Sequence, residues 1–359
     1  MPGADIRGVT VTTRPGAHAL ESLSTAVVGE WAALSDEVGA DPFSHPGWVT
    51  AWGRAFGIDV RVATLRREGH LVAAYPVEVT GGRGWRAAAD WHTPHLDVVG
   101  NPSAAAELFG ALVARRRRVS FDFATGHTAD LARASLAGAG FRNRERVRQA
   151  SPWIDLGCGW EAYRDGLPSR KWREIRRRYR RLEAEGAAAY SQHDGATDLP
   201  ELLTEGFAVE GSGWKDASGT AVRSDPRVEA FYRDVAAWAA REGTLRLHFL
   251  RLDGRAIAFD LAFVANGAEW LLKTGFDPAL SAFSPGSLLR AEVLERVFAD
   301  GLARYEFLGA AAPWKLEWTE STRDVVLCDG FAPGIRGSID MYGASVARRA
   351  RVRRAQSGR

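Results

Sequence analysis

Cysteine is scarce in this chain of 359 residues, which contains only Cys158 and Cys328. They lie far apart and outside any C-x-x-C or cysteine–histidine spacing, which excludes a disulfide-stabilised scaffold. We expect both to be small apolar residues of strands. No stretch approaches the roughly eighteen uncharged apolar residues that a membrane span needs. The first residues also lack the basic and apolar regions of a secretory signal, so we expect a cytoplasmic protein.

The sequence also lacks a convincing metal site. His92, His95 and Asp97 are close together, but no further ligand clusters with them in the sequence. Pro94 prevents the two histidines from sharing one face of a helix. We therefore expect no metal ion here, and a polar loop that borders a cleft between domains.

The composition is that of a folded chain, with 46% apolar, 25% charged and 10% aromatic residues. Its length exceeds what one hydrophobic core usually serves, so we expect two domains. The net charge is only +3, yet the segment Arg170–Arg181 contains eight basic residues and a single acid, Glu174. A local basic cluster in an otherwise slightly acidic chain indicates a polyanionic partner or substrate.

The second half of the chain has the clearest local pattern. Three strand-like segments, TLRLHFLRL, RAIAFDLAFV and AEWLLKTGF, are joined by Asp253-Gly254 and Asn266-Gly267, dipeptides typical of type I′ turns. This pattern predicts a three-stranded antiparallel meander. Capping residues and helical spacing predict helices on both sides of it, at about 169–185, 198–210, 226–241 and 287–300. Further strands are predicted at AAAYSQH, ARYEFLG and RDVVLCDG.

The first half repeats this order of elements, but its turn and capping signals are weaker. Strands are predicted at IRGVTVTT, DVRVATLRR, LVAAYPVEV, WRAAADW and VSFDF, and helices at about 19–34, 46–55 and 103–115. Pro46 corresponds to Pro226 and Gly69 to Gly254, at a nearly constant offset. The shared order, without sequence identity, predicts a structural duplication.

Several motifs of the second half resemble a known family. They are GWKDASGTAV at 213–222, LLKTGFDPALSAFSPGSLLRAEVLE at 271–295, YEFLGAAAPWKLEWT at 305–319 and LPSRKWREIRRRYRRLEAEG at 167–186. Their combination resembles the CelD/BcsL-type acetyltransferases of the GNAT superfamily, which are linked to cellulose and exopolysaccharide loci. That family in turn resembles the FemABX peptidyltransferases, which carry two tandem GNAT-like domains. The resemblance covers about 165–325, and extends to the first half only in the order of elements.

The resemblance implies an α/β (α+β) fold of two tandem GNAT-like domains, each a mixed, mostly antiparallel sheet flanked by helices. We place a degenerate first domain at 1–150, the acyltransferase domain at 151–340 and a basic tail at 341–359. The implied activity is transfer of an acyl group, in the first place acetyl, from acyl-CoA to an amine. The acceptor would be an amine on a sugar, a polysaccharide precursor or a specialised metabolite.

The resemblance also implies where the donor binds. In GNAT enzymes the third meander strand exposes backbone N–H groups to pantetheine and to the oxyanion, here around Lys273 and Thr274. The pyrophosphate lies at the N-terminus of the next helix, where free N–H groups and the helix dipole favour an anion. The corresponding candidates are Ser284, Gly286, Ser287 and Leu288. A plain helix cap is the alternative interpretation of this segment.

Acyl transfer to an amine needs a proton acceptor and groups that stabilise developing negative charge. In a chain poor in lysine, the family motifs contain Lys215, Lys273 and Lys315. The carboxylate candidates are Glu210, Asp260 and Asp277. Asp260 stands among alanines on the second meander strand, where it either pairs with His248 across the hairpin, which would make a base, or faces solvent over the cleft. Asp277 precedes a proline, so its alternative role is to start a turn.

Two other functions remain open at this point. One is an aminoacyl-tRNA-dependent transferase of FemABX type, in which the helix Arg170–Arg181 binds tRNA or a nucleotide-linked substrate. The other is a non-catalytic carbohydrate- or nucleotide-binding protein, because the thirteen tryptophans suit sugar stacking as well as core packing.

Overall fold

The computed structural model describes residues 17–81, 84–114, 116–212, 219 and 221–343. In its first half, an edge strand and two helices precede a meander, which is followed by two helices and two long strands. The elements are β1 (Ala17–Ser22), α1 (Thr25–Val38), η1 (Pro42–Ser44), α2 (Pro46–Phe56), β2 (Val60–Arg67), β3 (His70–Thr80), β4 (Gly84–Ala87), β5 (Val99–Gly100), α3 (Pro102–Val113), β6 (Arg118–Ala124), α4 (Gly126–Gly138) and β7 (Arg142–Asp155).

The second half repeats this order after two connecting helices, which confirms the predicted duplication. The connecting helices are α5 (Trp160–Gly166) and α6 (Ser169–Glu183). The repeat comprises β8 (Ala188–His193), α7 (Leu199–Gly211), η2 (Val222–Ser224), α9 (Pro226–Arg241), β9 (Leu245–Leu252), β10 (Arg255–Ala265), β11 (Ala268–Phe276), η3 (Pro278–Phe283), α10 (Pro285–Ala299), β12 (Arg304–Glu306), α11 (Pro313–Leu316) and β13 (Thr322–Phe331). A last helix occupies residues 335–343. Among the helices of the described residues, none has the length and apolar character to span a bilayer.

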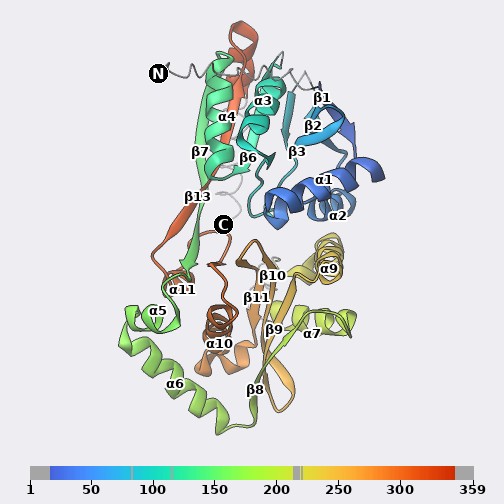
Figure 1. Ribbon diagram of the computed structural model, residues 1–359. Helices are drawn as coiled ribbons and strands as arrows, with labels where there is room; N and C mark the ends of the chain where they lie inside the picture. The colour runs from blue at the N-terminus through green and yellow to red at the C-terminus, as the bar shows by residue number, and fades with distance from the viewer. Residues whose placement is uncertain (1–16, 82–83, 115, 213–218, 220, 344–359) are drawn as a thin grey trace, which may run out of the picture.

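One sheet of thirteen strands runs through both halves (Figure 1). The strand order is β1-β2-β3-β4-β6-β13-β7-β12-β11-β10-β9-β8, with β5 beside β3. Neighbouring strands are mostly antiparallel, whereas β4–β6 and β11–β12 are parallel. The last strand, β13, was expected to complete the second half, but it lies between β6 and β7 in the sheet of the first half. Because β7 pairs with both β13 and β12, the boundary at residue 150 stays a prediction.

Turn and capping residues in the second half correctly predicted several of its helices and strands. The backbone φ angles of Asp253, Gly254, Asn266 and Gly267 are 49°, 81°, 52° and 68°, which confirms the predicted type I′ turns. The predicted helix 226–241 is α9, whose N-cap Asp225 accepts a hydrogen bond from the N–H of Arg227 at 2.9 Å.

The N-terminal region differs from expectation. Residues 17–22 form strand β1 rather than the start of a helix at 19, because they pair along their whole length with β2. Helix α4 was not predicted. The strand predicted at IRGVTVTT lies outside the described residues.

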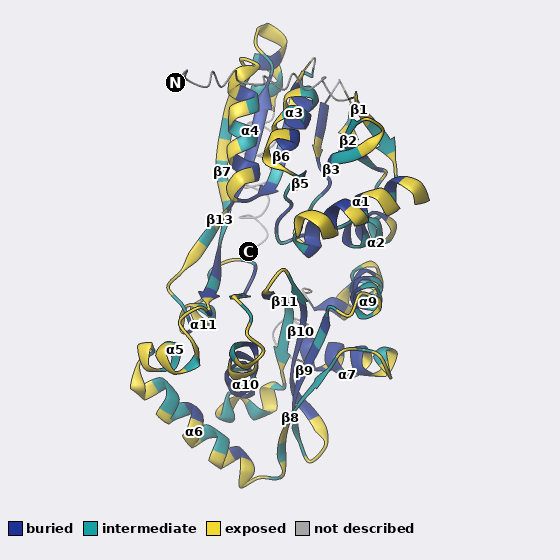
Figure 2. Cartoon of the chain, in the orientation of Figure 1, coloured by how far each residue is buried: buried dark blue, intermediate teal, exposed yellow. Residues whose placement is uncertain are grey.

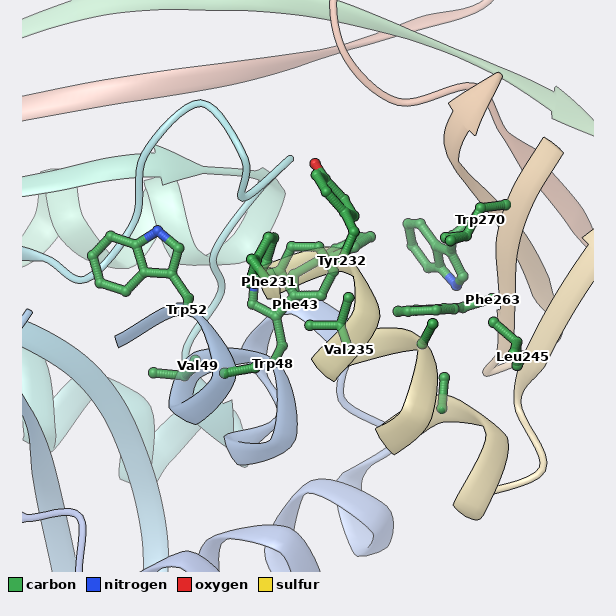
Figure 3. Packing of buried hydrophobic residues seen from close by; sticks show 14 of the residues in the cluster. Phe43, Trp48, Val49, Trp52, Phe231, Tyr232, Val235, Leu245, Phe263 and Trp270 are labelled. Carbon is green, nitrogen blue, oxygen red and sulfur yellow. The ribbon is translucent and has the colours of Figure 1, made fainter. Parts of the chain in front are cut away.

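A shared aromatic core joins the two halves (Figure 3). Trp48 of α2 meets Phe231 of α9 with ring centroids 5.0 Å apart, and Phe43 meets Trp270 of β11 at 5.6 Å. Gly47 permits this approach, since a Cβ atom there would lie 2.3 Å from the indole ring of Trp238. Figure 2 shows that exposed residues concentrate on outward helix faces while the central strands are buried. The junction between the halves is therefore well packed, and the site lies beside it.

Candidate functional site

The strands β11 and β12 separate after a short parallel ladder. They pair only from Ala268 with Arg304 to Trp270 with Glu306, while β11 continues to Phe276 alongside β10 alone. The register of β10 and β11 also shifts at Leu272, which indicates a bulge. The N–H groups expected to be exposed lie around Lys273 and Thr274, which both line the opening, and the ladder ends three residues before Lys273, at Trp270.

A cavity of about 650 Å³ occupies this opening. Its walls are β11, the loop after β12, the start of α10, the end of α7 and a loop of the first half. The first half contributes Trp91, His92, Thr93, Pro94, Phe123 and Gln149. The loop around His92 was expected to border a cleft between domains, and it does so.

Glu210 and Lys273 bring opposite charges to the cavity wall. Glu210, at the end of α7, is 2% exposed, and its carboxylate accepts a hydrogen bond from the N–H of Val222 at 2.9 Å. The ammonium of Lys273 lies 4.4 Å from the centre of the Tyr232 ring. Burial lowers the pKa of Lys273, and the charge of Glu210 offsets this shift only in part.

The close contact between α7 and β11 fixes the position of Glu210. A Cβ atom on Gly275 would lie 2.4 Å from the Cα of Glu210, so only glycine lets the helix end approach the strand this closely. The GWK motif follows this helix in the sequence, but its Lys215 lies outside the described residues.

His92 and Tyr232 meet across the two halves at the same cavity. The Nδ1 atom of His92 lies 3.4 Å from the hydroxyl oxygen of Tyr232. Burial lowers the pKa of His92, and the charge of Lys273 lowers it further, against the opposing effect of Asp90. Sequence analysis did not select either residue for the site, because they lie 140 positions apart and nothing in the sequence pairs them.

Lys315 supports the cavity wall formed by the loop after β12. Its ammonium donates hydrogen bonds to the carbonyl oxygens of Leu308 and Ala310. Leu308 and Gly309 both have positive φ angles, 53° and 60°, so the ammonium stabilises a sharply turned backbone. Lys315 and Trp314 also line the cavity, and a catalytic role for Lys315 stays a prediction.

The N-terminus of α10 reaches the cavity through Gly286 and Ser287. The other two donor-site candidates, Ser284 and Leu288, do not line it, and Leu288 is fully buried in the core. The N–H groups of Ser287 and Leu288 bond to the carbonyl of Ser284 at 2.9 and 3.2 Å. Within the described residues, the N–H of Gly286 has no hydrogen-bond acceptor, so it is the backbone donor available at this helix end.

Helix α6 adds positive charge beside this helix end. The Nη1 atom of Arg178 donates a hydrogen bond to Oγ of Ser284 at 2.8 Å. On the same side of α6, the ammonium of Lys171 lies 3.8 Å from the ring centre of Trp318, a residue of the cavity wall, and 3.0 Å from Glu317. Both residues belong to the basic segment Arg170–Arg181 that the sequence shows, but their contacts depend on how α6 packs.

Asp260 and Asp277 do not line the cavity. Asp277 accepts a hydrogen bond from the N–H of Ala279 at 2.9 Å and pairs with Arg255 at 2.9 Å, so it caps the turn after β11. Asp260 is fully buried and lies 2.6 Å from the guanidinium of Arg290. The expected pairing of Asp260 with His248 is wrong.

His248 is opposite Asp260 in the strand register, yet its side chain has other partners. Its Nε2 atom lies 3.2 Å from Glu269, and its Nδ1 atom lies 2.9 Å from the hydroxyl of Tyr190. Together with Asp260, Arg290 and Tyr305, these residues form a buried polar cluster between the sheet and α10.

A second polar cluster lies at the junction of the halves. Asp41, which sequence analysis did not consider, lies 2.9 Å from Nε2 of His95, and Asp97 lies 4.0 Å from the same atom. Burial disfavours the charge on His95, but the hydrogen bond to Asp41 and the charges of Asp41, Asp97 and Glu306 together raise the pKa of His95. The ligand atoms of Asp41, His95 and Asp97 lie within 4.8 Å of one another, a spacing that could hold a metal ion, whereas His92 faces the cavity.

Comparison with known proteins agrees with this geometry. Residues 169–316 match the family described as acetyltransferase (GNAT) domain. No curated protein matches the chain.

Three solved structures of similar fold cover most of the chain. The C-terminal domain of a putative lysylphosphatidylglycerol synthetase from Agrobacterium fabrum is 15% identical, covers 90% of this chain and 97% of its own, and has a TM-score of 0.54. L-PGS from Bacillus licheniformis is 14% identical, and the match covers 87% of this chain and 93% of that protein, with a TM-score of 0.57. FemX is 11% identical, and the match covers 84% of this chain and 95% of FemX, with a TM-score of 0.58.

At these identities the likeness establishes the fold, while the family match at residues 169–316 includes the opening between β11 and β12. The chain therefore contains a GNAT acetyltransferase domain at residues 169–316, within a fold of two tandem GNAT-like units, and is an acyltransferase by class.

Proposed function

We propose that this protein transfers an acyl group, in the first place acetyl, from acyl-CoA to an amine, and that the thioester lies in the opening between β11 and β12. The observation that carries the proposal is the end of the ladder at Trp270, beyond which no described strand pairs with the cavity edge of β11. Strand N–H groups on that edge point away from β10 and are suited to a thioester carbonyl.

In the proposed reaction, the amine nitrogen attacks the thioester carbonyl carbon, and the carbonyl oxygen becomes an oxyanion bound by N–H groups of β11. The intermediate then collapses, the amide bond remains, and coenzyme A leaves as a thiolate. Glu210 is the proposed acceptor of the proton that the amine loses, directly or through one water. Lys273 is the proposed donor to the thiolate, because its lowered pKa eases release of its proton.

The acceptor is proposed to enter along the first half. Trp91 is 71% exposed at the cavity, and Phe123 lies beside it with ring centroids 5.6 Å apart. An exposed aromatic face such as that of Trp91 suits the apolar side of a sugar ring. This favours an amine on a sugar, a polysaccharide precursor or a related specialised metabolite as acceptor.

Acetyl-CoA at about a hundredfold excess over its Kd is expected to raise the free energy of unfolding by about 2.7 kcal/mol, because it binds the folded state alone. Thermal denaturation with and without the ligand measures this. If acetyl-CoA and longer acyl-CoA thioesters all leave the melting temperature unchanged, the proposed donor is wrong.

Replacing Gly286 with valine is expected to raise the Kd of acetyl-CoA at least about tenfold while the fold is kept. A Cβ atom there meets Phe276 at 3.4 Å, an ordinary contact, and the added methyl groups enter the space proposed for phosphate. The matched control is Gly29→Val, on the exposed face of α1 with nothing within 4 Å of the Cβ atom. Unchanged donor affinity in Gly286→Val would place the phosphates elsewhere.

A second candidate is transfer of an aminoacyl group from tRNA, and the arginine face of α6 is the observation that favours it. Six of its arginines are exposed: Arg170, Arg173, Arg176, Arg177, Arg180 and Arg181. A phosphate backbone would bind there with steep salt dependence, and RNase treatment would abolish activity. Activity that survives RNase and needs only acyl-CoA excludes this candidate.

A further inference from the structure

The helix at residues 335–343 has an apolar face that no described residue covers. Ile335, Ile339 and Tyr342 are 82%, 63% and 73% exposed. Their spacing of four and three residues places them on one face of the helix. In the sequence, Val346 continues the same spacing. Three large apolar side chains together on a surface helix mark a place of contact with another apolar phase.

Polar contacts hold this helix so that its apolar face points outward. Asp340, on the side away from the apolar face, pairs with Arg117 at 3.1 Å, and Ser338, beside that face, accepts a hydrogen bond from Arg142 at 2.7 Å. A helix on the surface of a globular protein ordinarily turns its apolar stripe toward the core. Here the arrangement is reversed, which means that the stripe is not used for packing within the described part of the chain.

The surroundings of this helix are strongly basic. Arg118 and Arg142 both pair with Phe331, the last residue of β13, and Arg336 is exposed on the helix itself. Asp329 and Asp340 pair with arginines.

We propose that this end of the molecule docks on the surface of a bilayer that contains anionic lipid. Isoleucine and tyrosine side chains enter the boundary between headgroups and acyl chains, while arginines bind the lipid phosphates. A second copy of this chain is not the proposed partner, because two surfaces of the same positive charge would repel each other. Nucleic acid is not the proposed partner either, because binding to a phosphate backbone would leave the isoleucine side chains in water.

The docking surface is separate from the acyl-transfer cavity. Figure 1 shows the helix, at the red end of the colour scale, at the top of the first half and away from the second half. None of Ile335, Ile339 and Tyr342 lines the cavity. Docking therefore leaves the cavity accessible, and its test does not depend on the proposed reaction.

Co-sedimentation of the full chain with vesicles tests the proposal. The protein is expected to bind vesicles that contain phosphatidylglycerol and to remain in solution with phosphatidylcholine alone. The variant Ile335→Ser/Ile339→Ser is expected to bind vesicles at least about tenfold more weakly, because it lacks two apolar side chains that would enter the bilayer. Leucine at both positions is expected to restore binding.

Two matched controls separate this surface from general effects. Val38→Ser removes an apolar side chain that is 39% exposed at the end of α1, far from this helix. Arg173→Ser/Arg180→Ser removes two exposed arginines of α6. Both controls are expected to bind like the original chain. Equal binding by Ile335→Ser/Ile339→Ser, absence of binding to every vesicle, or an isoleucine-dependent dimer in sedimentation would each overturn the proposal.

Discussion

Replacing Glu210 with glutamine is expected to lower kcat for acetyl transfer by about a hundredfold to ten-thousandfold. The amide keeps an oxygen to accept the N–H of Val222, so the end of α7 stays in place. What the variant loses is the group proposed to take the proton from the attacking amine. Steady-state kinetics with acetyl-CoA and an amine acceptor measure the effect, and KM for the donor is expected to change little.

The matched control is Glu205→Gln on the same helix. Glu205 pairs with Arg251 at 2.8 Å and does not line the cavity, so its loss is expected to leave kcat unchanged. If Glu210→Gln retains the original kcat at saturating substrate, Glu210 is not the base.

Replacing Arg290 with methionine is expected to lower the free energy of unfolding by about 3–5 kcal/mol. Its side chain is 2% exposed, that of Asp260 is 1% exposed, and they lie 2.6 Å apart. Burial works against the charge on Arg290, but its interactions with Asp260, Tyr305 and Glu269 together outweigh burial and raise the pKa of Arg290. Removing the guanidinium leaves a carboxylate buried without its counter-charge. Urea denaturation measures the loss.

Two further variants distinguish this account from simple loss of packing. Arg296→Met, on the same helix, removes an arginine that is 55% exposed and pairs with Asp300, so it is expected to cost less than about 1 kcal/mol. The double variant Arg290→Met/Asp260→Leu is expected to recover most of the loss, because no unpaired charge remains. A loss below about 1 kcal/mol in Arg290→Met alone would contradict the role assigned to the pair.

Elements defined by short-range chemistry could be predicted from the sequence. The turns at Asp253-Gly254 and Asn266-Gly267 require φ above zero at both central residues, which these residue types tolerate, so the meander could be located closely. The capping of α9 by Asp225 is equally local. The placement of β13 is not, since nothing within its own segment encodes pairing with β6, some 200 residues earlier.

The candidate site shows the same division. Lys273 and Gly286 could be selected because they lie in a motif that begins in the last strand of the meander, and Glu210 because it closely precedes the GWK motif; all three line the cavity. The expectation that Asp260 needs a partner was sound, but the partner chosen was the nearest residue by strand pairing. Arg290 lies on a helix that packs across the sheet, so only the tertiary structure places it beside Asp260.

The central claim is that the acyl carrier occupies the opening between β11 and β12. A crystal structure of the protein soaked with coenzyme A tests this most directly. The account predicts the pantetheine arm along β11 beyond Trp270 and the pyrophosphate against Gly286 and Ser287. Coenzyme A ordered at any other place, or an opening that stays free of it at saturating concentration, would contradict the claim.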